Sequence, residues 1–169
     1  MYLVLGVIDV PYTDADAPPR KIPQAKSGKA NHPLAKSADL DAPATTGGVA
    51  ELLEHNYSVM GAFAKAHAQD IERAIIKSLE GQIVNLSLGA PVLDSGAAFA
   101  EACESIAQDF RDFLDKSEIE QMGIPGVPTQ AAKDGVNHRL KNPYSKDNPR
   151  RPSFVDTGLY QTTMRAWTE

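Results

Sequence analysis

The stretch SGAAFAEACESIAQDFRDFLD, residues 95–115, decides the fold. Its apolar side chains recur at steps of three and four residues, which is the period of one helix face. These side chains are Phe99, Cys103, Ile106, Phe110 and either Phe113 or Leu114, and the carboxylates Glu101, Glu104, Asp109 and Asp112 fall on the other face. Asp94 or Ser95 can cap the first turn. We therefore expect an amphipathic helix from about Ser95 to Asp115.

A second helical pattern lies upstream, from about Val49 to Gly81. Its inward face is formed by Met60, Phe63, Ala64, His67, Ile71, Ala74, Ile75, Ser78 and Leu79. Gly81 suits the position just past a helix end. The next residues, 84–88, are apolar but few, and Ala90-Pro91 interrupts them. We expect one long helix, with His67 as a hydrogen-bonded histidine of the core.

Strands are predicted near both ends of the sequence. Tyr2–Val10 is rich in Leu, Val and Ile, and Pro11 closes it. Phe154–Thr168 alternates as a strand does, with the D-T-G triplet 156–158 as a turn or kink at its start. Before it, GIPGVP (123–128) breaks the chain, and Thr129 can cap a shorter helix from Gln130 to about Leu140. The predicted fold class is α+β, with two long amphipathic helices packed on a small antiparallel sheet.

The length of 169 residues, with 42% hydrophobic content, suits a single domain. Within it, residues 49–122 form the predicted helical part, and residues 123–169 the basic loop and C-terminal strand. Residues 12–46 are dense in Pro, Ala, Lys, Asp and Ser and hold almost no large apolar side chain, so burial cannot offset the entropy of ordering them. We expect either a disordered segment or a long extended N-terminal arm that becomes ordered on a neighbouring subunit.

Charge is distributed unevenly, although the net charge is only -5. Basic residues gather in residues 20–36 and 133–151, and acids dominate the helical middle. Such asymmetry often marks a surface that meets partners, and the alternative is an ordinary solvated helix face beside two basic loops. The possible interface residues are Arg20, Lys21, Lys26, Lys29, Arg150 and Arg151. No apolar run approaches the about 20 residues of a membrane span, so we expect no membrane partner.

Candidate chemistry is sparse. A D-T-G triplet supplies one carboxylate in aspartic proteases, but Leu159 follows it here, where that family has Ala or Ser. The histidines His32, His55, His67 and His138 lack metal-ligand spacing. Cys103 lies on the predicted buried stripe, which favours packing over reactivity. No glycine-rich phosphate loop follows a strand. We expect neither an enzyme nor a bound cofactor or metal.

The segment GVPTQAAKDGVNHRLKNPYSKDNPRRPSFVDTGLYQTTMRAW, residues 126–167, carries a resemblance. It is similar to the closing region of tailed-phage virion-morphogenesis and tail-completion proteins, the family of head–tail joining and neck proteins. The matching residues are Pro152, Phe154, Val155, Asp156, Thr157, Gly158 and Leu159, after a basic stretch from His138 to Arg151. The helix 98–114 matches by position and pattern. Tyr160 departs from the family, which more often has Arg or a second aliphatic residue there, and the N-terminal arm is unusually long.

The resemblance implies a structural virion protein, made in the host bacterial cytoplasm. It would be a ring-forming head–tail connector, neck or tail-completion subunit through which DNA passes. Its partners would be itself, as a cyclic hexamer, and neighbouring neck, portal or adaptor, or tail-tube proteins. The D-T-G residues would then form a structural kink ahead of a strand, and acidic helix faces lining the bore would keep DNA mobile.

Two alternatives stay open. One is a minor tail or capsid-decorating protein, whose arm lies on a different lattice. The other is a small cytoplasmic module that binds nucleic acid with its basic segments, for which salt-dependent DNA affinity is the signature.

Overall fold

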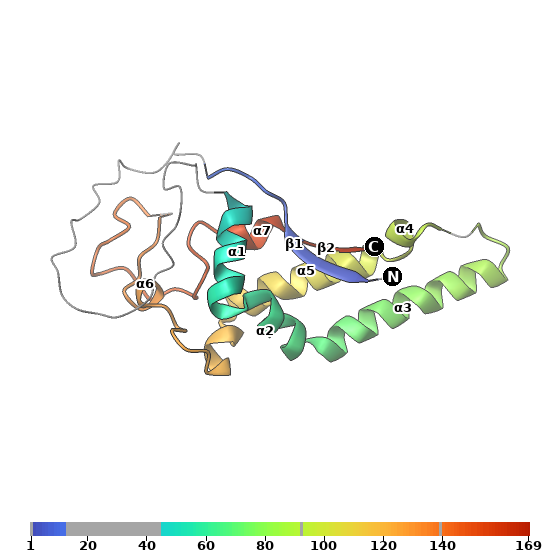
Figure 1. The fold of residues 1–169 in the computed structure, drawn as a ribbon, viewed down its shortest axis with the longest axis horizontal. Coiled ribbons are helices and arrows are strands. Elements are labelled where there is room, and N and C mark those ends of the chain that lie inside the picture. The colour runs from blue at the N-terminus through green and yellow to red at the C-terminus, as the bar shows by residue number, and fades with distance from the viewer. Residues whose placement is uncertain (1, 13–44, 92, 139) are drawn as a thin grey trace.

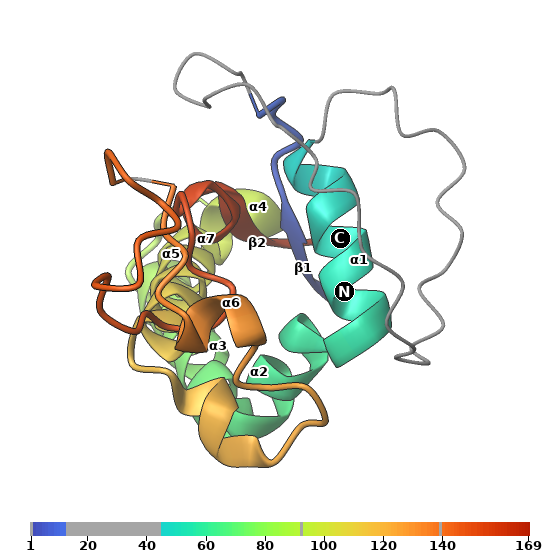
Figure 2. The same cartoon turned by 90° about the vertical axis from the view of Figure 1, so that its left-hand side faces the viewer.

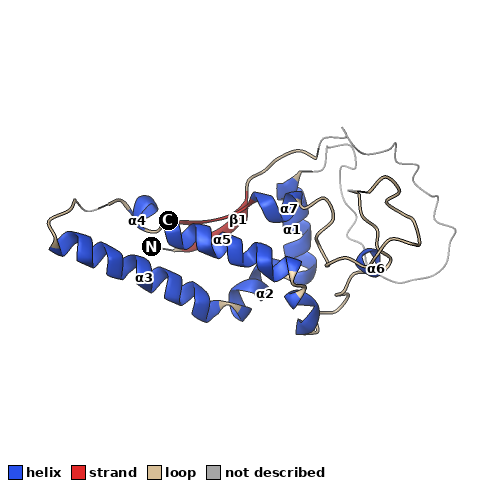
Figure 3. Ribbon diagram, turned by 180° about the vertical axis from the view of Figure 1, so that it is seen from behind, coloured by secondary structure: helices blue, strands red, loops and turns tan. Residues whose placement is uncertain are grey.

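The computed structural model describes residues 2–12, 45–91, 93–138 and 140–169. Helices dominate it, and a small antiparallel sheet of two strands completes it (Figures 1 and 3). The predicted α+β class is therefore confirmed. The predicted arm, 12–46, lies outside the described residues except for its ends. The elements in order are β1 (Leu3–Val7), α1 (Thr46–Tyr57), α2 (Val59–Ala66), α3 (Ala68–Ser87), α4 (Ser95–Ala98), α5 (Ala100–Asp115), the 3-10 helix η2 (Glu118–Met122), α6 (Gln130–Lys133), α7 (Leu159–Thr163) and β2 (Met164–Thr168).

Helix α5 is the centre of the fold. It packs against β2 and against α3, and α1 and α2 cross one end of the body (Figures 1 and 2). The apolar face predicted for residues 95–115 is buried throughout, with Phe99, Cys103, Ile106, Phe110, Phe113 and Leu114 each at most 9% exposed. Phe63 from α2 joins Phe110 and Phe113, with ring centroids 5.3 and 5.6 Å apart. The helical pattern of this stretch therefore identified the face that α5 contributes to the core.

The predicted single helix 49–81 is wrong, because the chain forms α1, α2 and α3 there. The first break falls at Ser58, whose φ is 49°. The Glu54 carboxylate accepts hydrogen bonds from the backbone N–H groups of Met60 (2.7 Å) and Gly61 (3.2 Å), so a side chain caps the start of α2. The second break falls at His67. The helix also begins earlier than predicted, because Thr45 caps α1 by accepting from the Gly48 N–H at 3.2 Å.

The structure confirms the prediction that His67 is a packed, hydrogen-bonded histidine. Its ring stacks on Phe63 at 5.0 Å between centroids. Nε2 lies 3.0 Å from the Glu118 carboxylate, and Nδ1 lies 3.4 Å from that of Asp70. These contacts hold the junction between α2 and α3 against the chain that follows α5.

Gly81 does not end its helix, which continues to Ser87 and absorbs the predicted separate segment 84–88. The helix stops where Gly89 adopts a left-handed φ of 81°.

The helix predicted from Gln130 to Leu140 is likewise wrong in length, because α6 ends at Lys133. Gly135 follows with a φ of 68°, and a Cβ there would lie 2.5 Å from the Asn148 carbonyl oxygen.

The predicted C-terminal strand is also shorter than expected. Residues 159–163 form α7, and β2 covers only Met164–Thr168. Hydroxyl groups stabilise α7, since Thr163 Oγ1 donates to the Leu159 carbonyl at 2.9 Å and Thr162 Oγ1 to that of Gly158 at 3.0 Å. β2 pairs antiparallel with β1, from Leu3 opposite Thr168 to Val7 opposite Met164. The predicted pairing of the first and last strands is confirmed, with both strands shorter.

Among the helices of the described residues, none combines the length and the apolar character that a membrane crossing requires.

The buried hydroxyl group of Tyr160 leads to a prediction about stability. It is 3% exposed, and its hydroxyl has no hydrogen-bond partner in the described structure. Burial accordingly raises the pKa of Tyr160. A buried, unpaired hydroxyl is unfavourable, so Tyr160→Phe should leave the free energy of unfolding unchanged or raise it by up to about 1 kcal/mol. Urea denaturation measures this, and a loss of stability would contradict it.

Candidate functional site

The D-T-G loop is held by contacts with residues far from it in sequence. The Asp156 carboxylate accepts a hydrogen bond from the His138 backbone N–H at 2.8 Å, and its second oxygen contacts Nδ1 of the same residue. The Arg151 guanidinium lies 3.9 Å from it. The Asp156 side chain therefore bonds to the backbone 18 positions earlier in the sequence. This carboxylate joins the loop to the basic stretch that precedes it.

The rest of the triplet behaves as a turn. Thr157 Oγ1 accepts from the Leu159 N–H at 3.3 Å, which is a local side-chain-to-backbone bond typical of a turn. Gly158 has a φ of 80°, as expected for a glycine that permits a kink, but the element it introduces is the helix α7. Phe154 adopts a φ of 67°, which is unusual for an aromatic residue, and its ring lies 5.1 Å from that of Tyr57.

Arg151, predicted as a possible interface residue, is engaged within its own chain. Its side chain is only 11% exposed. Nη1 donates to the carbonyl oxygens of Pro152 (3.2 Å) and Val155 (3.0 Å), and Nε contacts that of Val136. These bonds satisfy backbone carbonyls on both sides of the loop. The charge of Arg151 therefore has a structural role within the chain.

Glu120 is a site residue that sequence reasoning missed. Its side chain is 8% exposed and forms an ion pair with Arg150, whose own side chain stays 57% exposed. One Glu120 oxygen accepts from both the backbone N–H (2.9 Å) and the hydroxyl (2.8 Å) of Ser153, which is fully buried. The Ser153 hydroxyl oxygen in turn accepts from the Thr129 N–H at 3.1 Å. Pro152, part of the predicted motif, thus lies between Arg151 and Ser153, whose side chains are both held by hydrogen bonds.

A line of polar groups runs outward from Asp156. His138 Nε2 lies 3.0 Å from the Tyr144 hydroxyl, and the two rings meet edge to face. Tyr144 is 70% exposed. Tyr12 lies near the same carboxylate, and the pKa of Tyr12 is raised first by burial and then by the negative charge of Asp156. The contacts between the acid, the histidine and Tyr144 help to fix the fold of the loop.

The four other predicted interface residues, Arg20, Lys21, Lys26 and Lys29, lie outside the described residues. Within the described part of the chain, no cluster of three or more His, Cys, Asp or Glu side chains could hold a metal ion.

The acidic face of α5 is partly neutralised by basic side chains of the same chain. Lys77, Arg111 and Lys116 pair with Glu101, Glu104 and Asp112 at 3.2, 3.3 and 2.8 Å.

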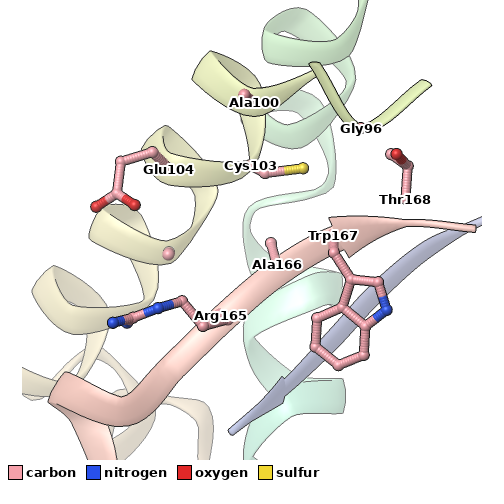
Figure 4. A pocket seen from close by; sticks show the side chains of 9 residues that line it. Gly96, Ala100, Cys103, Glu104, Arg165, Ala166, Trp167 and Thr168 are labelled. Carbon is pink, nitrogen blue, oxygen red and sulfur yellow. The ribbon is translucent and has the colours of Figure 1, made fainter. Parts of the chain in front are cut away.

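A cleft of about 280 Å³ opens between α5 and β2, which we name the α5–β2 cleft (Figure 4). Its lining residues are Gly96, Ala100, Cys103, Glu104, Ala107, Arg165, Ala166, Trp167 and Thr168. Burial raises the pKa of the Cys103 thiol, so the neutral thiol is favoured. The prediction that Cys103 has a packing role is confirmed by its burial.

No protein-family model, curated protein or solved structure matches this chain. The resemblance of residues 126–167 therefore stays a prediction.

The Asp156 contacts lead to a testable prediction. Asp156→Asn keeps an oxygen that can accept from the His138 N–H but removes the charge that faces the His138 ring and Arg151. We expect a loss of about 1–2 kcal/mol in the free energy of unfolding, measured with urea. Asp147→Asn, on the exposed part of the same loop, is the matched control and should change stability by less than about 0.5 kcal/mol. Equal effects of the two variants would contradict the role given to Asp156.

Proposed function

We propose that the chain is a structural virion protein of a tailed phage, a ring-forming head–tail connector, neck or tail-completion subunit through which DNA passes. The observation that carries the proposal is the set of motif residues on which the family resemblance rests, Pro152 and residues 154–159. One of them, Asp156, anchors a loop by binding the chain at His138. Ser153, which lies within the same stretch, binds Glu120. Such use of the motif supports a structural role.

The position of the loop supports the same reading. Through Gly158 and α7, the loop leads directly into β2, the strand that pairs with β1 and packs on α5. A loop with fixed geometry therefore fixes where β2 enters the body. A subunit of a ring has to present its surfaces at defined angles to two neighbours, and rigid anchoring of this kind serves that need.

The partners in this proposal are other copies of the chain, in a cyclic hexamer, and neighbouring neck, portal or adaptor, or tail-tube proteins. DNA would be a partner only in transit. Acids outnumber bases in residues 51–120, which favours a bore that does not retain DNA. The exposed carboxylates paired with Lys77, Arg111 and Lys116 contribute less to this field than their number suggests.

The experiment is light scattering of the purified protein, followed by electron microscopy of any assembly and limited proteolysis of residues 12–46. We expect the mass of a closed ring and protection of this segment. A protein that stays monomeric at every concentration, alone and with purified virion parts, would overturn the proposal. Rings located on the capsid surface or along the tail would favour the capsid-decorating or minor tail alternative.

One observation favours a second candidate, a small nucleic-acid-binding module. Exposed basic residues lie at the end of α6 and in the loop after it, namely Lys133, Lys141, Lys146 and Arg150, and the exposed Tyr144 lies among them in sequence. Basic and aromatic side chains in one segment suit a single-stranded nucleic acid. A titration of DNA across salt concentrations tests this. Affinity that falls steeply with salt, in a protein that remains monomeric, would favour the module over the ring subunit.

A further inference from the structure

The outer side of α3 carries an apolar stripe that no described residue covers. It consists of Ile76, Leu79, Ile83 and Leu86, which are 45, 44, 66 and 59% exposed. Their spacing of three, four and three residues aligns them along one face of the helix, as in the seam of a coiled coil. The side of α3 that meets the core is a different one, formed by Ile71, Ala74 and Ile75. The helix therefore has two apolar faces and uses only one of them within the subunit.

Further exposed apolar side chains lie in the last turn of α3 and in the segment after it. Val84 is 55% exposed, Leu88 79% and Leu93 44%. Residues 81–93 contain no charged side chain. Together with the stripe they make seven large apolar side chains, each at least 44% exposed. Exposed apolar side chains gathered on one part of a fold in this way suit a protein partner.

The α5–β2 cleft is a suitable acceptor on another face of the fold. Its floor is apolar, with Ala100, Cys103, Ala107 and Ala166 among the lining residues, and no residue of α3 lines it (Figure 4). A subunit thus offers an apolar projection in one place and an apolar recess in another. Two different surfaces that fit each other are what a head-to-tail contact requires.

Charge supports the same pairing. Glu80 follows Leu79 of the stripe, is exposed, and makes no ion pair with any described residue. Arg165 lines the cleft, and its Nη1 donates only to the carbonyl oxygens of Thr162 (3.0 Å) and Met164 (2.7 Å). Among the described residues, no carboxylate pairs with it. An unpaired acid beside the projection and an unpaired base beside the recess are complementary.

We propose that the apolar stripe of one subunit docks into the α5–β2 cleft of a second copy, with Glu80 of the first facing Arg165 of the second. The inference rests on the proposed function, because repetition of such a contact around an axis builds a ring.

The first test is the mass of charge variants in solution. Ile83→Asp places a charge in the middle of the stripe and should raise the dissociation constant of the assembly at least tenfold. Gln69→Asp, an exposed change near the start of α3, is the matched control and should assemble as the unmodified protein does. Both positions are exposed, so thermal unfolding of the monomer should be unchanged in each.

The second test identifies the acceptor. Glu80→Arg and Arg165→Glu should each weaken assembly, and the double variant should restore it. In a Cys103→Ala background, Leu86→Cys and Glu104→Cys subunits should be cross-linked by a short bis-maleimide when mixed, and neither should be cross-linked to itself.

The outcomes separate the two proposals. If rings form but neither Ile83→Asp nor the charge swap affects them, the docking inference is wrong and the proposed function stands. If Leu86→Cys subunits are cross-linked efficiently to one another, the stripe pairs with a second stripe, and the inference is again wrong. If no assembly forms and the mixed cysteine variants give no cross-link at high concentration, both the inference and the ring fail.

Discussion

Replacing Phe110 with alanine is expected to lower the free energy of unfolding by about 3–5 kcal/mol. Phe110 is fully buried, and its ring contacts those of Phe63 and Tyr160 at centroid distances of 5.3 and 5.9 Å. The variant removes apolar burial and leaves a cavity at the point where α2, α5 and α7 meet. For a domain of this size, a loss of this amount can approach the whole stability.

Urea denaturation with a tryptophan fluorescence readout measures the loss, because Trp167 lies on β2. Ser105→Ala, on the exposed side of the same helix, is the control and should change stability by less than about 0.5 kcal/mol. A loss below about 1 kcal/mol for Phe110→Ala would mean that the aromatic cluster is not the centre of the core.

The second large effect is expected from Glu120→Ala, which should lower the free energy of unfolding by about 2–3 kcal/mol. The variant deprives the buried Ser153 N–H and hydroxyl of their acceptor, and it leaves Arg150 without its carboxylate. Ser153 lies three residues before Asp156, and its anchor to Glu120 holds the end of the preceding loop. Without this anchor, residues 133–151 should also become more accessible to proteases.

The neighbouring Gln121→Ala is the matched control, because Gln121 is exposed and should tolerate the change. Glu120→Gln should fall between the two, since it keeps an acceptor for Ser153 and loses the charge that pairs with Arg150. If Glu120→Ala left both stability and proteolysis unchanged, the anchoring role of Glu120 would be wrong.

The buried face of residues 95–115 was predicted correctly, although the predicted single helix is divided at Phe99 into α4 and α5. Helix α5 packs along its length, so its apolar period reports the buried face directly. The failure at 49–81 has an equally specific cause. The chain breaks at Ser58 and His67, although the apolar period continues across both breaks. The break at Ser58 depends on the Glu54 carboxylate, which caps the start of α2. Periodicity carries no information about such a cap.

The site was foreseen in part. Gly158 was expected to permit an unusual backbone angle, and it does, whereas the contact of Asp156 with His138 joins residues 18 positions apart. Glu120 and Ser153 are 33 positions apart. Contacts between loops follow no period, so single-sequence reasoning has no signal for them. The alternation of residues 159–163 predicted a strand, but hydroxyl bonds to carbonyls four residues earlier support the turn of helix instead.

The pairing of β1 with β2 also sets an order of events during synthesis. Val7 lies opposite Met164, so the first strand waits for its partner until nearly the whole described fold has been translated. At about 5–20 residues per second, this wait is on the order of ten seconds. During that time Leu3, Val4 and Leu5 form an apolar segment with unpaired backbone groups, which other chains can bind. Yield in the cell should therefore depend on how the nascent N-terminal strand is shielded, even when the finished subunit is stable.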